Sequence, residues 1–424
     1  MTAAFLRAQR RTWSSLRNHR NYRIFFAGQV VSVTGTWMQN IAAAWLVLTL
    51  THSPVAVGVL MLCQFLPATA LGLVGGVIVD RLDVRRVVIV TQAASMVFAS
   101  VLAGLTLGGV IEVWQVYLLT FLRGVSLVFD HPARQQLTFQ MVGRDELPNA
   151  VALNSGLFNG TRVIWPALGG AVIATAGVGA CFLLNAASFV AVLASLALIR
   201  PRDLVPLDRG DVRPTLIRGS REALAFLRQV PAAGMVLGLV LLVTTLSFNF
   251  NVLLPVLAAK TLDEGPEVFG IITAFFGAGA LIGALTAASI SRASPKILLA
   301  GTAAFGVAQL ALAPQTTLVG AAPFLFAAGI AFTLWTSNAN ASLQLATPDR
   351  LRGRVMGLYY FAFNGAGPAG GMLAGWLAAT GGTALAFTVA GVSAITVSAV
   401  AFAVLARRLQ KPRSAASRPG TVSA

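Results

Sequence analysis

The sequence predicts an all-α membrane protein with twelve transmembrane helices in two six-helix halves and both termini in the cytoplasm. Three observations predict it: the composition, the number of apolar runs and the distribution of basic residues. Of 424 residues, 56% are hydrophobic and 11% are charged, and the mean hydropathy is +0.77. This fraction of polar residues is too low to cover the surface of a globular protein in water. The composition therefore indicates a membrane protein.

Twelve apolar runs are long enough to cross a bilayer, because a helix needs about 20 mostly apolar residues to span the hydrocarbon. An even number of crossings returns both termini to one side. The predicted spans are 24–50, 54–79, 87–109, 113–130, 150–176, 180–199, 233–259, 268–290, 297–313, 319–345, 355–379 and 384–406.

The basic residues sort by side of the membrane. One set of alternating loops and tails carries 28 of the 31 Lys and Arg residues, whereas the opposite loops carry Lys260 beside four acidic residues. Because Lys and Arg stay cytoplasmic during insertion, the basic side is the cytosol. The net charge of +17 is then a consequence of topology, and nucleic acid is not an expected partner. We expect a multi-pass protein of the inner (plasma) membrane.

The longest polar interval divides the chain into two halves. Within it, Ser220–Gln229 has the pattern of an amphipathic helix on the membrane surface. A faint repeat relates "PALGG" at Pro166 to "PAGG" at Pro368, and duplicated halves are typical of secondary transporters. The predicted segments are a basic tail 1–23, a six-helix half 24–199, a linker 200–232, a six-helix half 233–406 and a tail 407–424.

A dense group of charges, "GGVIVDRLDVRR", follows the second predicted span. It resembles the signature loop of the major facilitator superfamily, with matches at Gly76, Asp80, Arg81 and Arg85. The resemblance implies contacts between the halves that hold the cytoplasmic side shut. Asp83 stands where many members have Gly. The alternative is a loop that only anchors the chain on the inside.

A second pattern covers residues 129–170, "FDHPARQQ…LPNAVALNSGLFNGTRVIWPALGG", together with "DRLRGRVMGL" at 349–358. It is similar to the bacterial efflux branch of this superfamily, which includes enterobactin exporters and macrolide efflux proteins. The resemblance implies export of small amphipathic molecules, driven by the proton gradient. Trp165 stands where the antiporter motif of the fifth span has Gly.

Charged residues within spans are the first candidates for coupling, because each costs about 2.5–3.5 kcal/mol at the centre of a membrane helix. They are Arg123, Asp130 and Arg162. Asp130 is the single carboxylate placed within a span and so the first candidate for carrying a proton. It lies four residues from Arg134, which allows a local pair, and a bridge to Arg162 is a second option. The alternative role is a static ion pair that fixes spans four and five.

Uncharged polar residues on spans one, five, seven and ten predict a substrate cavity. The alternative is a structural role, in which these residues form hydrogen bonds between packed helices, each worth about 0.6 kcal/mol. Phe275, Phe276, Phe361 and Phe363 are candidates for an aromatic wall. The predicted cavity residues are Gln29, Ser32, Thr36, Gln39, Asn40, Asn159, Thr245, Asn249, Trp335 and Asn338.

The favoured function is a proton-coupled exporter that works by alternating access on small amphipathic molecules. An importer or symporter on the same scaffold is the alternative, and a non-transporting scaffold or sensor is a further one. The three His lie on different sides of the membrane, which argues against a membrane enzyme. The sequence also lacks the G-x-x-x-x-G-K-[ST] motif that would bind ATP. We expect no cofactor or metal, and a monomer whose partners are substrate, protons and the bilayer.

Overall fold

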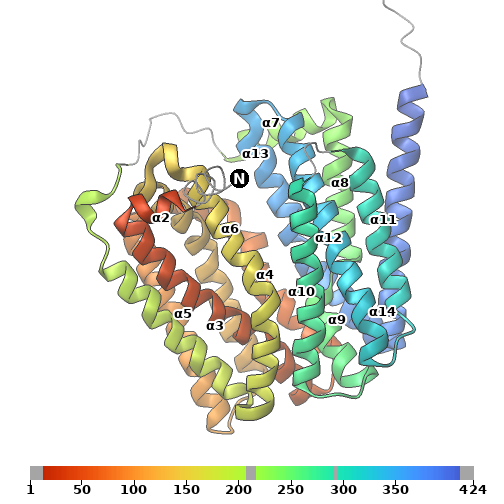
Figure 1. The fold of residues 1–424 in the computed structure, drawn as a ribbon, viewed down its shortest axis with the longest axis horizontal. Helices are drawn as coiled ribbons and strands as arrows, with labels where there is room; N and C mark the ends of the chain where they lie inside the picture. The colour runs from red at the N-terminus through yellow and green to blue at the C-terminus, as the bar shows by residue number, and fades with distance from the viewer. Residues whose placement is uncertain (1–12, 207–215, 290–293, 411–424) are drawn as a thin grey trace, which may run out of the picture.

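A computed structural model describes residues 13–206, 216–289 and 294–410, which form helices and connecting turns with no strand among them. Figure 1 shows two groups of helices side by side. The first group holds α2 (Ser14–Asn18), α3 (Arg20–Thr51), α4 (Pro54–Val79), α5 (Val84–Leu107) and α6 (Val113–Ala197), followed by the short η1 (Pro201–Asp203). The second group begins with α7 (Leu216–Gln229).

The remaining helices of the second group contain two π-helical turns, η2 and η3. Span seven is broken, since α8 ends at Leu246 and α9 begins at Phe250. The order is α8 (Pro231–Leu246), α9 (Phe250–Val256), η2 (Leu257–Thr261), α10 (Pro266–Ser289), α11 (Pro295–Leu312), α12 (Leu318–Ala346), α13 (Asp349–Tyr360), η3 (Phe361–Gly365) and α14 (Gly367–Gln410).

The longest helices contain sharp breaks at glycines. In α6 the backbone leaves helical geometry at Gly143 and Gly177, where φ is 71° and 81°. Glycine has no Cβ and reaches positive φ without strain. In α14 the break lies at Gly381 and Gly382. Each break separates two helical segments, so that α6 supplies three segments and α14 supplies two.

Among the described residues, nine segments are long and apolar enough to cross a membrane. The difference from the twelve predicted spans has identifiable sources. Three of the nine run through a glycine break, and α3 is not among the nine. The three are 113–157, 164–197 and 351–406. Helix α3 carries the predicted polar stripe, which lowers its mean hydropathy.

The two groups meet at the end of the molecule opposite α2, α7 and α13; we call the end that carries these three helices the basic end (Figure 1). The contact is made by glycines. A Cβ on Gly58 of α4 would lie 2.7 Å from the Gly371 carbonyl oxygen of α14, and one on Gly270 of α10 would lie 2.7 Å from the Pro166 carbonyl oxygen of α6. The backbones therefore touch, as small residues permit between membrane helices.

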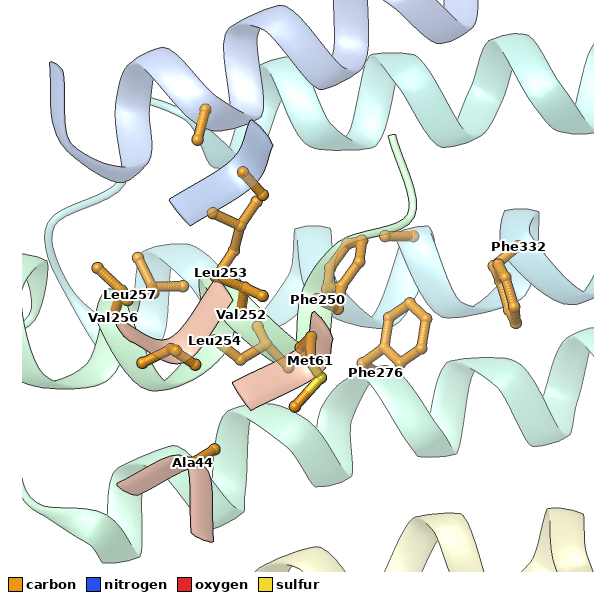
Figure 2. Close-up of a cluster of buried hydrophobic side chains, with 14 of the residues drawn as sticks. Ala44, Met61, Phe250, Val252, Leu253, Leu254, Val256, Leu257, Phe276 and Phe332 are labelled. Carbon is orange, nitrogen blue, oxygen red and sulfur yellow. The ribbon is translucent and has the colours of Figure 1, made fainter. Parts of the chain in front are cut away.

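Apolar side chains fill the junction between the groups. Trp45 of α3 stacks on Phe269 of α10 at 6.0 Å between ring centroids. Met61 of α4 and Phe250 and Val252 of α9 belong to the same buried cluster, drawn in Figure 2. Toward the basic end the two groups diverge (Figure 1). The molecule is thus joined at one end and spread at the other.

Candidate functional site

Asp130 lies in α6 with 2% of its surface exposed and is fully hydrogen-bonded. Its Oδ2 accepts from Arg134 Nε and Nη2 at 3.0 and 2.7 Å. Its Oδ1 accepts from Thr91 Oγ1 at 2.9 Å and from Gln92 Nε2 at 2.8 Å, both on α5. The local Asp130–Arg134 pair is the one that the four-residue spacing allows. Charge neutralisation and these donors make the buried carboxylate tolerable.

The groups around Oδ1 can exchange donor and acceptor roles. The Thr91 hydroxyl has one hydrogen, yet its oxygen also lies 3.0 Å from the carbonyl oxygens of Val87 and Val88. The Gln92 amide has a buried Oε1 without a hydrogen-bond partner among the described residues. A hydroxyl accepts as well as donates, and an amide can turn to offer its oxygen. The pocket can therefore accommodate Asp130 in either protonation state.

Arg123 is the other charged residue in the buried part of the described chain, with 6% exposure. Its Nη1 donates to Asn40 Oδ1 of α3 at 3.2 Å. Next to it, a Cβ on Gly124 would lie 2.8 Å from the Gln64 carbonyl oxygen, so α6 packs closely on α4 at this level. Two of the predicted site residues, Asn159 and Arg162, have side chains outside the described part of the chain.

The predicted polar stripe of α3 separates into two faces. Gly28, Ser32, Gly35 and Gln39 recur at helical spacing, and a Cβ on Gly35 would lie 2.6 Å from Asn185 Oδ1 of α6. Asn185 Nδ2 donates to Gln39 Oε1. Ser32 and Gln39, both under 5% exposed, therefore lie on a face packed against the last segment of α6, and their contribution to a substrate cavity stays a prediction.

The other residues of this stripe have different surroundings. Gln29 is buried, and its Nε2 has no described partner. Thr36 and Asn40 are half-buried, and Asn40 accepts from Arg123. Asn40 is therefore the predicted stripe residue that the structure brings to an intramembrane charge.

The loop between α4 and α5 makes its described contacts within the first group. Asp80 Oδ1 accepts from Gln136 Nε2 of α6 at 2.7 Å. Arg85 Nη2 and Nε donate to the Leu196 carbonyl oxygen at 2.8 and 3.1 Å, at the end of α6. Asp83 accepts from the Arg86 backbone N–H and so caps α5, which gives this departure from the family motif a local function. Gly76 is half-buried, and Arg81 is exposed.

A cavity of about 60 Å³ lies between the two groups at the break between α8 and α9. Irregular backbone inside a membrane is tolerated where it lines a cavity, and π-helical turns such as η3 are frequent at functional sites. Asparagines and aromatic rings dominate the lining, which is Met61, Phe65, Thr244, Phe248, Asn249, Asn251, Val252, Phe363, Asn364, Gly367 and Gly371.

Of the predicted cavity residues, Asn249 lines this space and also donates from Nδ2 to the Thr245 carbonyl oxygen at 2.9 Å. Thr245 bonds its own helix at Leu241, and its neighbour Thr244 lines the cavity instead. Asn251 and Asn364 are lining residues that the sequence reasoning missed. The sequence signal was present, since each lies beside Phe residues at a helix irregularity, in "FNFN" and "FAFNG".

Trp335 and Asn338 of α12 do not line this cavity, and both lie against α11 or the turn before it. Trp335 is fully buried and meets Phe332 edge to face at 5.9 Å. Asn338 Oδ1 accepts from the Ser294 backbone N–H, just before α11 begins. Their contribution to a substrate site stays a prediction.

Aromatic rings form a continuous cluster inside the second group. Phe248 stacks on Phe332 at 4.2 Å, and Phe250 stacks on Phe276 at 4.6 Å. Phe276 and Phe363 thus belong to an aromatic cluster, and Phe363 also lines the cavity. Phe275 and Phe361 are 40% and 43% exposed and face outward.

Residues 10–421 match the sequence model of a major facilitator family described as transmembrane secretion effector. The chain belongs to this family. The predicted resemblance to the superfamily and its efflux branch is confirmed.

Individual relatives agree with the family assignment. The staphyloferrin A transporter of Staphylococcus aureus is 25% identical over 92% of this chain and 97% of its own length. The enterobactin exporter EntS of Escherichia coli is 28% identical over 82% of each chain. An inward-facing bacterial homologue of the lysosomal transporter Spinster superposes with a TM-score of 0.69 at 13% identity, covering 94% of this chain and 99% of that one. The last comparison shows the fold alone.

The protein is therefore a multi-pass protein of the inner membrane and a transporter rather than an enzyme. Its relatives carry out efflux of small molecules.

Proposed function

We propose that this protein is a proton-coupled secondary exporter of small amphipathic molecules that works by alternating access. The proposal includes twelve crossings, obtained when α3 is counted and when α6 and α14 are divided at their glycine breaks. It also places the basic end and both termini in the cytosol, because Lys and Arg gather there.

The surroundings of Asp130 carry the proposal. A coupling site must hold a carboxylate in both protonation states within one fold. Thr91 and Gln92 can each donate to the ionised form and accept from the protonated form. A carboxylate held only by cations and backbone N–H groups would lack this second set of bonds. The arrangement favours a titrating residue over the static ion pair.

The division into two halves supports alternating access. The proposed segments are the tail 1–23, the half 24–199, the linker 200–232, the half 233–406 and the tail 407–424. Contacts between the groups gather at the end opposite the basic end, whereas Asp80 and Arg85 bond within the first group. We propose that this is the inward-open state and that the Asp80 loop contacts the second half when the basic end closes.

The cavity at the α8–α9 break is the proposed substrate site. Its asparagines and phenylalanines suit a molecule with both apolar and hydrogen-bonding groups. Export is favoured over import because the enterobactin exporter is a relative along most of both chains.

The test uses everted membrane vesicles with a pH-sensitive dye, energised and then challenged with siderophores, macrolides and lipophilic cations. We expect substrate-triggered proton release with the wild type, none with Asp130→Asn, and partial release with Asp130→Glu. The control is Asp203→Asn, an exposed carboxylate on η1, which should behave as the wild type. Undiminished release with Asp130→Asn would place the coupling proton elsewhere. Substrate accumulation without proton movement would reject coupling itself.

A further inference from the structure

A second, larger cavity lies on the outside of the first group at the basic end. It has a volume of about 610 Å³ and is formed by Asp83, by residues 84–86 and Ile89 of α5, by Gln140 of α6, and by Pro201 with residues 204–206 beyond α6. We call it the α5 groove. None of its residues takes part in the cavity between the two groups.

Specific contacts build the walls of the α5 groove. The Val205 backbone N–H donates to the Gln140 carbonyl oxygen at 2.8 Å, which holds the chain after α6 against the middle of that helix. Arg85 bonds the carbonyl oxygen of Leu196 and so joins α5 to the end of the last α6 segment. The groove is thus a fixed feature of the fold rather than a space between independent loops.

The α5 groove is positively charged, and the guanidinium group of Arg86 is exposed to solvent. The Arg86 side chain is 86% exposed, and its contact with Asp83 is a single one of 3.7 Å between groups that water screens. Arg85 adds a second guanidinium from a half-buried position. Just beyond the groove, exposed Arg200 and Arg202 outnumber Asp203. Arg86 therefore offers donors for an anion.

An exposed apolar face continues from Arg86 along α5. Val90, Val97 and Val101 follow at spacings of four, seven and four residues, which keeps them on one side of the helix. They are 65%, 53% and 41% exposed. Leu198 at the end of α6 is 58% exposed, and the last segment of α6, yellow-green in Figure 1, lies at the outer edge of the first group. In a membrane protein such a face is covered by acyl chains.

We infer that the α5 groove binds the headgroup of an anionic phospholipid, with its phosphate on Arg86 and its acyl chains on the Val90–Val101 face. A cationic groove beside an acyl-covered helix at the membrane surface matches both parts of such a lipid. A zwitterionic lipid has the same chains, but its choline group is repelled by the surrounding guanidinium groups. The site is independent of Asp130 and of the substrate cavity.

The test measures lipid binding to the purified full-length protein in detergent by native mass spectrometry, without substrate or a proton gradient. We expect phosphatidylglycerol to bind about fivefold or more tightly than phosphatidylcholine of the same chains. Arg86→Gln should remove most of this preference, and Arg86→Lys should retain much of it. Arg17→Gln is the matched control, since Arg17 is an exposed arginine on α2 outside the groove, and it should change nothing.

Three results would overturn the inference. Equal binding of the two lipids would remove the anionic specificity. An equal loss with Arg86→Gln and Arg17→Gln would indicate attraction to general surface charge. Displacement of phosphatidylglycerol by an equal concentration of inorganic phosphate would indicate a free-phosphate site. Thermal unfolding without added lipid should be the same for Arg86→Gln and the wild type. Because transport is not measured, failure of proton coupling would leave this result intact.

Discussion

The two groups of helices use opposite chemistry within the membrane. The first group contains both charged residues that are buried in the described chain, Arg123 and Asp130, with a network of polar partners. The second group has an aromatic cluster centred on Phe332, and its described charged residues lie toward the ends of its helices. One half is therefore built to hold charge and the other to exclude it.

This difference shows that the two halves of one fold can have different physical roles. A polar network can respond to a proton because its bonds have alternative arrangements. An aromatic cluster packs in one arrangement and gives a firm wall to a cavity. The space at the α8–α9 break is lined mainly by the second group, so the proposed substrate site and the proposed proton site lie mainly on different halves. Under the proposed function, coupling then requires the halves to move relative to each other.

Removal of the counter-ion of Asp130 should give the largest loss of stability, and this loss lies in the first half. Arg134→Gln leaves the Asp130 carboxylate buried without its cation, and we expect a loss of about 3–5 kcal/mol in unfolding free energy. Chemical denaturation in detergent measures it. The double variant Asp130→Asn/Arg134→Gln removes both charges and should recover a large part of the loss. An equal loss in the single and double variants would mean that the ion pair is not the cause.

The aromatic half should be more tolerant of losing one group. Phe332→Ala removes a ring that contacts five others, and we expect about 3 kcal/mol, toward the lower end for buried Phe. The reason is that lipid provides no hydrophobic force between helices, so the loss is one of packing. Phe361→Ala, at 43% exposure, is the control and should cost less than 0.5 kcal/mol, about the size of ordinary surface effects.

The junction between the halves can be tested with a single methyl group. In Gly270→Ala the new Cβ would lie 2.7 Å from the Pro166 carbonyl oxygen, which should disfavour closure of the end opposite the basic end by about 1–3 kcal/mol. Distances between spin labels across that end should lengthen. Gly104→Ala, where a Cβ meets nothing within 4 Å, should leave the distances unchanged. An unchanged distribution with Gly270→Ala would show that this contact does not hold the end shut.

The smallest effect separates packing residues from cavity residues. Asn185→Ala removes the donor to Gln39 and should cost about 0.6 kcal/mol, as for hydrogen bonds between membrane helices, without changing which substrates are exported. Asn364→Ala, at the cavity, should change relative export among the same compounds. Growth inhibition across the compound panel gives the substrate profile of both variants, and chemical denaturation in detergent gives the stability loss of Asn185→Ala. A changed substrate profile with Asn185→Ala would indicate that Gln39 contributes to the substrate site.

Composition and residue pattern by themselves indicated a helical membrane protein, and the resemblance of its motifs indicated a transporter of the major facilitator superfamily. Lipid permits few exposed polar groups, so apolar length and Arg placement leave a strong linear signal. The Asp130–Arg134 pair could also be predicted from the sequence, because a spacing of four residues on one helix brings the two side chains together.

Only the tertiary structure decided which neighbour each polar face meets. The α3 residues Gln39 and Asn40 are adjacent in sequence, yet one bonds Asn185 and the other Arg123. Trp335 and Asn338 lie against α11 or the turn before it, whereas Asn251 and Asn364 line the cavity. A helical period shows that a face is polar, but the rotation and distance of the neighbouring helices determine whether that face packs or lines a cavity, and those depend on contacts far apart in the chain.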